Sequence, residues 1–254
     1  VGQILDFGTS AGDKLKVVDI NYTKSFGDLT VQVGDSLDAS SQFTGACAYS
    51  GFTDQLADCG TGKSAGLGGD VTVSSSYDIG GGFTAGFGIT SAHGSSTEGM
   101  ITKEGADAYG AQLAYATDTY GLAVSYSNFD AGTDATTLLG ASDTVFYGFN
   151  GYYTIGGPID SISLGYEVGD PGTKVDTTNW FAGVTTAEIG PGTIGFGVGT
   201  AGHTNEYNDE SIVYEASYSW DVNDATSMTV GGFVKEQHGA GIEDLSGIAL
   251  TTTF

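Results

Sequence analysis

The stretch "DVTVSSSYDIGGGFTAGFGI", residues 70–89, contains two short segments of alternating character around a glycine-rich turn. The apolar residues of each segment recur at every second position, at Val71, Val73, Tyr77 and Ile79 and then at Phe83, Ala85, Phe87 and Ile89. Because successive side chains of a β-strand point to opposite faces, this spacing predicts two strands with one apolar face and one polar face each. The glycines between them predict a tight hairpin.

The same two-residue period extends along the chain, for example in "AYGAQLAY", "GLAVSY" and "SIVYEASYSW". A comparably long helical pattern does not occur. The pattern predicts fourteen strands, over residues 1–9, 14–26, 28–37, 70–79, 82–91, 107–118, 120–129, 144–155, 159–169, 178–189, 192–199, 210–221, 226–236 and 245–254. Short turns and longer acidic connections alternate between these strands, so the short turns are expected at one rim and the long loops at the other.

These features are typical of a transmembrane β-barrel, with strands of roughly 10 residues, short periplasmic turns and long outer loops. An even number of strands lets the first strand pair with the last, which closes the sheet against lipid. We therefore expect residues 1–254 to form a single all-β domain. Its predicted architecture is a closed antiparallel transmembrane β-barrel of about 14 strands, with a range of 12–16.

The amino-acid composition agrees with a β-barrel. It argues against a disordered chain and against a protein with transmembrane helices. Apolar residues make up only 39% of the 254 residues, yet 14 tyrosines and 13 phenylalanines are too many for a disordered chain. The 43 glycines occur with only 3 prolines, which argues against a disordered linker. No apolar stretch reaches the 18 residues that a transmembrane helix needs. The first residues, "VGQILDFGTS", lack the features of a signal peptide and indicate a mature protein or a fragment.

The charge is strongly acidic, with 31 acidic residues against 7 basic ones and a net charge of -24. All the basic residues are lysines, because the sequence has no arginine. Nucleic acid is therefore excluded as a partner, since phosphate binding needs a basic surface. The excess of acidic residues favours cations as ligands. These could be permeating ions or, on the acidic loops, bound Ca²⁺. The alternative is that the acidic loops only keep the protein soluble.

Aromatic residues gather near the predicted short turns, where amphipathic rings suit a membrane interface. The expected interface residues are Phe26, Tyr77, Phe83, Tyr120, Tyr153, Trp220 and Phe254. The last of them ends "LSGIALTTTF", residues 245–254, in which Ile248, Leu250 and Phe254 share one face. A C-terminal aromatic residue after alternating apolar positions resembles the assembly signal of bacterial outer-membrane proteins.

Parity along the strands separates the lipid-facing positions from those that face the lumen. The expected pore-lining residues on the wall are Asp19, Asn21, Glu215 and Lys235. The long polar segment at residues 38–69 is expected to fold inward and narrow the pore, as one loop does in general-diffusion porins. This segment carries Asp54, Asp58 and Lys63. An external lid is the alternative, and residues 92–106 are a second candidate for the inward loop.

Two cysteines, Cys47 and Cys59, lie in this long segment and are expected to form a disulfide, which would stabilise by roughly 3 kcal/mol. Two free thiols are the alternative. No CxxC metal pattern or GxSxG elbow occurs, and His93, His203 and His238 are interpreted as surface-loop residues. The close glycines of "GFGVGTAG", residues 195–202, are interpreted as places where the wall bends. We expect neither an enzyme nor a cofactor.

Two stretches carry a family resemblance: "SISLGYEVGDP", and "DTTNWFAGVTTAEIGPGTIGFGVGT" after it. Together with "VYEASYSWDVNDATSMTVGGFV" and the ending "TTTF", they resemble the C-terminal part of cyanobacterial outer-membrane porins. These porins often carry an S-layer-homology domain and are distantly similar to carbohydrate-selective porins. The resemblance is best over residues 144–254 and covers the barrel part only. It implies a barrel in the outer membrane that lets ions and small solutes diffuse passively.

The sequence thus predicts a porin of the bacterial outer membrane, with lipid outside, small solutes and inorganic cations inside, and a homotrimeric assembly. Two alternatives remain. One is a plugged structural or receptor barrel. The other is a soluble, secreted β-protein that binds glycans or calcium.

Overall fold

The computed structural model describes residues 19–53, 56, 59–130, 143–172, 175–207, 209–238 and 243–253. They contain thirteen strands: β1 (Ile20–Phe26), β2 (Leu29–Asp35), β3 (Val71–Gly80), β4 (Phe83–Ser91), β5 (Asp107–Ala116), β6 (Tyr120–Asp130), β7 (Thr144–Thr154), β8 (Ile159–Asp170), β9 (Thr177–Thr186), β10 (Gly192–Thr200), β11 (Ile212–Asn223), β12 (Thr226–Lys235) and β13 (Leu245–Thr253).

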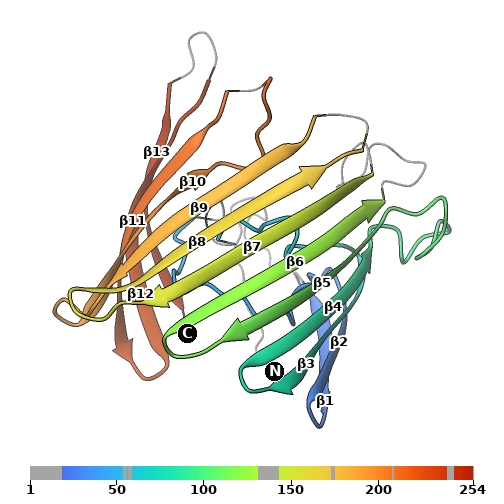
Figure 1. Cartoon of the computed structure of the whole chain (residues 1–254), viewed down its shortest axis with the longest axis horizontal. Helices are drawn as coiled ribbons and strands as arrows, with labels where there is room; N and C mark the ends of the chain where they lie inside the picture. The colour runs from blue at the N-terminus through green and yellow to red at the C-terminus, as the bar shows by residue number, and fades with distance from the viewer. Residues whose placement is uncertain are drawn as a thin grey trace, which may run out of the picture.

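The strands form one sheet in sequence order, and every neighbouring pair is antiparallel. Figure 1 shows that the sheet is strongly curved. Thirteen of the fourteen predicted strands are confirmed, with bounds that differ by a few residues. The strand predicted over residues 1–9 lies outside the described residues, and so do residues 14–18 of the second predicted strand. The pairing that would close the sheet is therefore not described.

The two faces of the sheet differ as the alternation predicts, and β6 is a clear case. Leu122 and Val124 are 62% and 49% exposed, whereas the intervening Ala123 is 4% exposed and Ser125 is 2% exposed. The exposed apolar side chains lie on the outer face of the curved sheet. The inner face carries small and polar side chains, and many of them are buried although the described residues form no second sheet that could cover them. Another segment of the chain must therefore cover the inner face.

The connections divide between two rims, as predicted. Short turns join β1 to β2, β3 to β4 and the later hairpins in alternation, and Gly27 and Gly81 adopt positive φ in the first two of these turns. A positive φ costs glycine little, which explains its place in turns of this kind. The long connection over residues 92–106 lies at the opposite rim (Figure 1).

Most of the predicted interface aromatics stand on the outer face near the short turns. Phe26, Tyr77, Phe83, Tyr120 and Tyr153 are all more than two-fifths exposed. Rings also contact each other along this rim, with 4.5 Å between the ring centroids of Phe83 and Tyr115 and 5.5 Å between those of Tyr218 and Trp220. Phe254 lies outside the described residues. The membrane-interface role of these rings stays a prediction.

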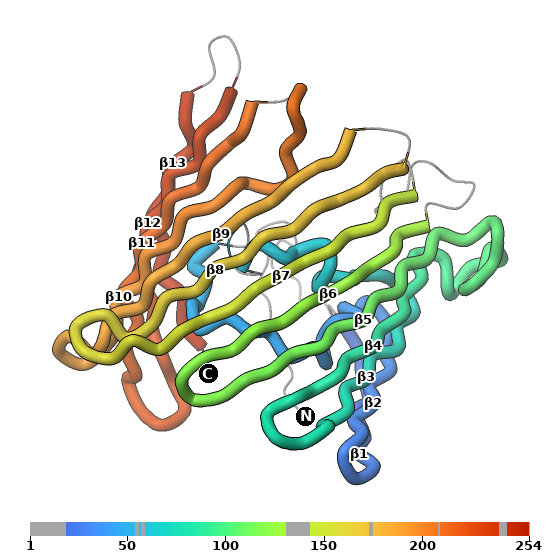
Figure 2. Tube along the Cα trace, viewed as in Figure 1, coloured from blue at the N-terminus to red at the C-terminus, as the bar shows by residue number. Residues whose placement is uncertain are grey.

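The buried core lies between the inner face of the sheet and the connection from β2 to β3, residues 36–70, which we call the inner loop. Its trace, blue to cyan in Figure 2, runs behind β6–β9, inside the curve of the sheet. Three clusters of buried apolar residues join the inner loop to the wall, around Phe181, Phe129 and Ala114. Among the described residues, no helix has the length and apolar character that spanning a membrane requires.

Candidate functional site

The inner loop crosses the wall in two legs, and its outgoing leg is held by polar side chains of the strands. The backbone N–H of Gln42 donates to the Ser74 hydroxyl of β3 over 3.2 Å. Further along, the N–H of Ala46 donates to Asn150 of β7 over 3.3 Å. The N–H groups of Ala48 and Tyr49 then both donate to the hydroxyl of Ser163 on β8, over 3.0 and 3.2 Å. The outgoing leg therefore crosses from β3 to β8.

The return leg runs back along the same wall. Asn150 of β7 donates to the Thr61 hydroxyl over 3.2 Å. The hydroxyls of Ser64 and Ser125 lie 2.7 Å apart, and Ser127 donates to the carbonyl of Lys63 over 2.9 Å, which attaches the leg to β6. Both legs therefore use polar side chains of the inner face.

Glycines on the inner face make room for the loop. A Cβ at Gly165 would lie 1.6 Å from the carbonyl oxygen of Cys59, and one at Gly148 would lie 2.0 Å from the Ser64 hydroxyl. Close approaches of this kind also occur at Gly86, Gly88, Gly110, Gly183, Gly197, Gly199 and Gly231. Glycine is the residue that lets another backbone come this near to a strand.

Three of the glycines in residues 195–202 also lie against the inner loop. A Cβ at Gly197 would lie 2.7 Å from the Tyr49 hydroxyl, and one at Gly199 would lie 3.0 Å from Leu56. Gly195 and Gly197 both face the Tyr49 ring. These positions leave room for side chains of the inner loop, and the bending of the wall at these glycines stays a prediction.

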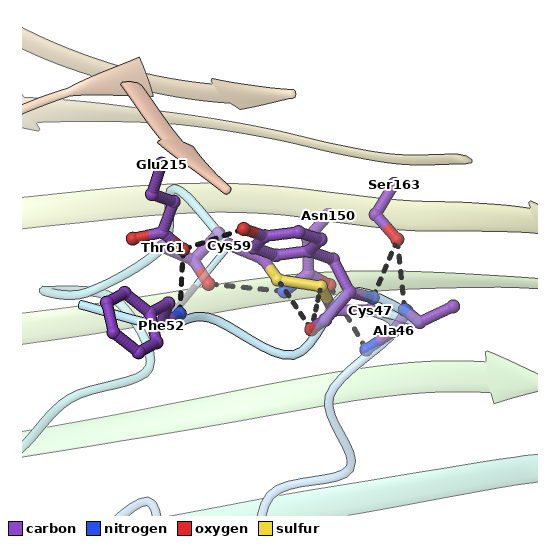
Figure 3. Close-up of a disulfide and its surroundings, with 10 residues drawn as sticks. Ala46, Cys47, Phe52, Cys59, Thr61, Asn150, Ser163 and Glu215 are labelled. Carbon is purple, nitrogen blue, oxygen red and sulfur yellow. Dashed lines mark hydrogen bonds between the residues drawn. A yellow bond between two sulfur atoms is a disulfide. The ribbon is translucent and has the colours of Figure 1, made fainter. Parts of the chain in front are cut away.

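The tip of the inner loop is fixed by Glu215 of β11 (Figure 3). One carboxylate oxygen accepts hydrogen bonds from the Tyr49 hydroxyl and the Phe52 N–H, each over 2.7 Å. The other accepts from the N–H and the hydroxyl of Thr53, over 2.8 and 2.6 Å. Burial and the neighbouring Glu215 carboxylate raise the pKa of Tyr49 well above its usual value, so its hydroxyl keeps the proton that it donates.

A second buried carboxylate, Glu167 of β8, fixes the return leg. It accepts hydrogen bonds from the N–H of Lys63 and, over 2.5 Å, from the N–H of Ser64. Its remaining partner is Nε2 of His203, also at 2.5 Å, from the connection between β10 and β11. Glu167 is fully buried. Glu215 and Glu167 thus each accept hydrogen bonds from two consecutive backbone N–H groups of the inner loop. Hydrogen bonds to a charged carboxylate are among the stronger ones in proteins.

The cysteines join the two legs. Cys47 of the outgoing leg and Cys59 of the return leg form a disulfide (Figure 3). Residues 48–58 therefore form a covalently closed tip, which carries the groups that bind Glu215.

The other predicted site residues have different surroundings. Asn21 accepts a hydrogen bond from the inner-face residue Gln32 over 3.1 Å and donates to Asp19 over 2.9 Å, which agrees with the expected parity of β1. Lys63 is exposed beside a cavity of about 500 Å³ that Asp70 also lines. Lys235 is cross-strand partner to the fully buried Val213. Asp54 and Asp58 lie outside the described residues.

Two expectations are corrected. Glu215 faces inward but is only 4% exposed, so the inner loop covers it and it does not line an open surface. His203 is not a simple surface residue, because its side chain is only 15% exposed and binds Glu167.

The other two histidines have nearby acidic residues. His93 lies 3.4 Å from Glu98, and His238 contacts the carbonyl of Glu210 at 2.8 Å. Within the described ranges, no group of three or more His, Cys, Asp or Glu residues could hold a metal ion.

Several residues of the inner loop are exposed. They include the small residues Ser41, Gly45, Ala48 and Ser50 of the outgoing leg and Lys63 of the return leg. Hydroxyl side chains also lie on the inner-face positions of the two outermost described strands, at Thr23 of β1 and at Thr251 and Thr253 of β13. The described side chains at these positions are therefore mostly small or polar.

Sequence reasoning did not single out Glu167, Asn150, Ser163 or Tyr49. One signal was available: Glu167 and Glu215 are acidic residues within strands, on the face opposite the apolar stripe. A second signal was the apolar content of the long connection, where Leu37, Phe43, Tyr49, Phe52, Leu56 and Leu67 would be costly to expose.

Comparison with solved structures identifies the fold as that of bacterial porins. A porin structure superposes with a TM-score of 0.63 at 15% identity, covering 92% of this chain and 80% of that one. A mutant porin from Rh. blastica gives 0.61 at 13% identity, with 96% and 80% covered. An anion-selective porin from Comamonas acidovorans gives 0.61 at 15% identity, with 94% and 76% covered. No protein-family model matches the chain, and a comparison with curated proteins finds no match.

Proposed function

We propose that this protein is an outer-membrane porin, a water-filled channel through which ions and small hydrophilic solutes diffuse passively. The observation that carries the proposal is a single wall with an exposed apolar outer face and a polar inner face on which a loop is docked. Such a wall suits lipid on one side and water on the other. Passive diffusion needs no cofactor and no catalytic residue. The porin fold of the similar structures supports this function.

A preference for cations is part of the proposal. The chain carries 31 acidic residues against 7 lysines and has no arginine, the residue best suited to bind anions. The similar porin from Comamonas acidovorans is anion-selective. Porins of one fold thus need not share a selectivity, which depends on the charges around each lumen.

Further parts of the proposal rest on the sequence. The resemblance of residues 144–254 to cyanobacterial porins supports a cyanobacterial source and an outer-membrane location. Closure of one barrel domain by the strand predicted over residues 1–9 also belongs to the proposal, and so does a homotrimer in the membrane. The predicted aromatic rim would sit at the lipid interface.

A plugged structural or receptor barrel is the second candidate, and the inner loop is the observation that favours it. The loop contacts inner-face residues from β3 to β12 and buries apolar side chains such as Tyr49 and Leu56 against them. A loop of this extent would block the passage if the remaining space were too small for hydrated ions.

Conductance across a planar lipid bilayer, measured under a KCl gradient, separates the two candidates. We expect stepwise openings with a reversal potential that favours K⁺. Steps that favour Cl⁻ would retain the channel and contradict the cation preference. An absence of steps, from protein shown to be inserted, would contradict the porin and favour the plugged barrel.

A further inference from the structure

Glu215 is a buried carboxylate whose hydrogen bonds all come from neutral groups of the inner loop. Most buried charges are paired with a charge of opposite sign. The structure gives it four hydrogen bonds, all from the neutral residues Tyr49, Phe52 and Thr53. Among the residues that the structure describes, no lysine or histidine lies within ion-pair distance of it. Hydrogen bonds from neutral donors stabilise a carboxylate but leave its net charge in place.

The other buried carboxylate provides a contrast. Glu167 lies 2.5 Å from Nε2 of His203, so this carboxylate has a cationic partner whenever His203 is protonated. Glu215 has no such partner among the described residues. Of the two, Glu215 is the stronger source of negative potential at the loop tip.

The loop tip covers Glu215, which is only 4% exposed. Tyr49 binds Glu215, while its chain neighbours Ala48 and Ser50 are exposed on the opposite side of the same segment. One layer of chain thus lies between the carboxylate and the water. Walls of low dielectric constant focus the field of a fixed charge into the water of a narrow cleft.

We propose that Glu215 is a specificity-determining residue of the channel, which favours cations through the loop tip although it does not touch the permeating ion. This inference rests on the proposed porin function. It differs from the expectation that exposed acidic side chains lining the pore supply the selectivity. In about 0.01 M salt, where the Debye length is about 30 Å, a unit charge about 10 Å from an ion changes the local concentration of that ion by a little under about twofold in water.

Three variants separate the charge from the mechanical role of Glu215. Glu215→Gln removes the charge, whereas Glu215→Asp keeps it and changes the contacts with the loop. Ser163→Ala is the matched control, because it removes the hydroxyl that accepts two hydrogen bonds from the inner loop and removes no charge. Asp54 and Asp58 stay unchanged throughout.

The measurement is the K⁺/Cl⁻ permeability ratio of single channels, from reversal potentials in dilute and in about 1 M KCl. In dilute salt, we expect Glu215→Gln to lower the ratio about twofold, while Glu215→Asp and Ser163→Ala stay near wild type. At about 1 M salt the difference should disappear, because the screening length falls to about 3 Å. Limited trypsin cleavage after Lys63 reports whether the loop stays docked in each variant.

The inference is overturned if Glu215→Gln keeps the wild-type ratio, or if Ser163→Ala lowers the ratio as much. It is also overturned if the difference persists unchanged at high salt, since loop displacement does not depend on screening. Failure of the porin function is a distinct result, because the wild-type protein would then give no channels at all.

Discussion

Gly165 illustrates how single residues set the position of the inner loop. Its missing side chain lets the backbone of Cys59 lie directly against β8. Tyr49 and Glu215 fix the loop tip in the same way, through contacts between residues that are 166 positions apart in the chain. At this scale the path of the inner loop is set by the side chains that are absent from the inner face as much as by those that are present.

We predict that Gly165→Ala displaces the return leg. The new Cβ would meet the Cys59 carbonyl at 1.6 Å, and such overpacking typically costs about 1–3 kcal/mol. The expected result is faster trypsin cleavage after Lys63 and a larger single-channel conductance.

Gly45→Ala serves as the control, because nothing lies within 4 Å of a Cβ at that position. Equal cleavage rates in the two variants would contradict the role assigned to Gly165.

Among the elements of the structure, the inner loop differs most from the strands. The strands repeat one local pattern, whereas the loop is held by hydrogen bonds to β3, β6, β7, β8 and β11 and by the disulfide between its legs. Its stability therefore depends on the whole wall and on the covalent closure of residues 48–58.

The double variant Cys47→Ser with Cys59→Ser is predicted to release the tip more easily. Closing a loop of this length stabilises it by about 3 kcal/mol in the chain-entropy model, and the two serines lose that contribution. We expect trypsin cleavage after Lys63 to accelerate in the variant. A reducing agent should have the same effect on the wild-type protein and none on the variant. A cleavage rate equal to that of the unreduced wild type would show that the hydrogen bonds alone hold the tip.

Seen as a whole molecule, the protein exposes apolar side chains over the outer face of its sheet, including Leu122, Phe149, Leu164 and Phe196. A soluble protein rarely leaves a continuous apolar surface of this extent in water. The outer face therefore favours the membrane-embedded barrel over the soluble β-protein.

The two tryptophans of the chain can test whether the outer face contacts lipid. Trp180 lies near the long-loop end of β9 and Trp220 near the short-turn end of β11, both on outer-face positions. In vesicles of brominated lipid we predict fluorescence quenching of both, measured separately in Trp220→Phe and Trp180→Phe. Vesicles of unbrominated lipid are the control. Unquenched fluorescence in both variants would contradict a lipid-facing outer surface.

The chain's own sequence determined the strands, the two rims and the two faces of the wall, because a two-residue period is a local property and each strand carries it independently. It also indicated the long segment that folds inward. Only the tertiary structure decided that Glu215 is buried beneath the loop tip, that Glu167 holds the return leg, and that the glycines of residues 195–199 accept Tyr49 and Leu56. These contacts join residues more than a hundred positions apart, and a local period carries no information about which distant backbone will lie against a given strand.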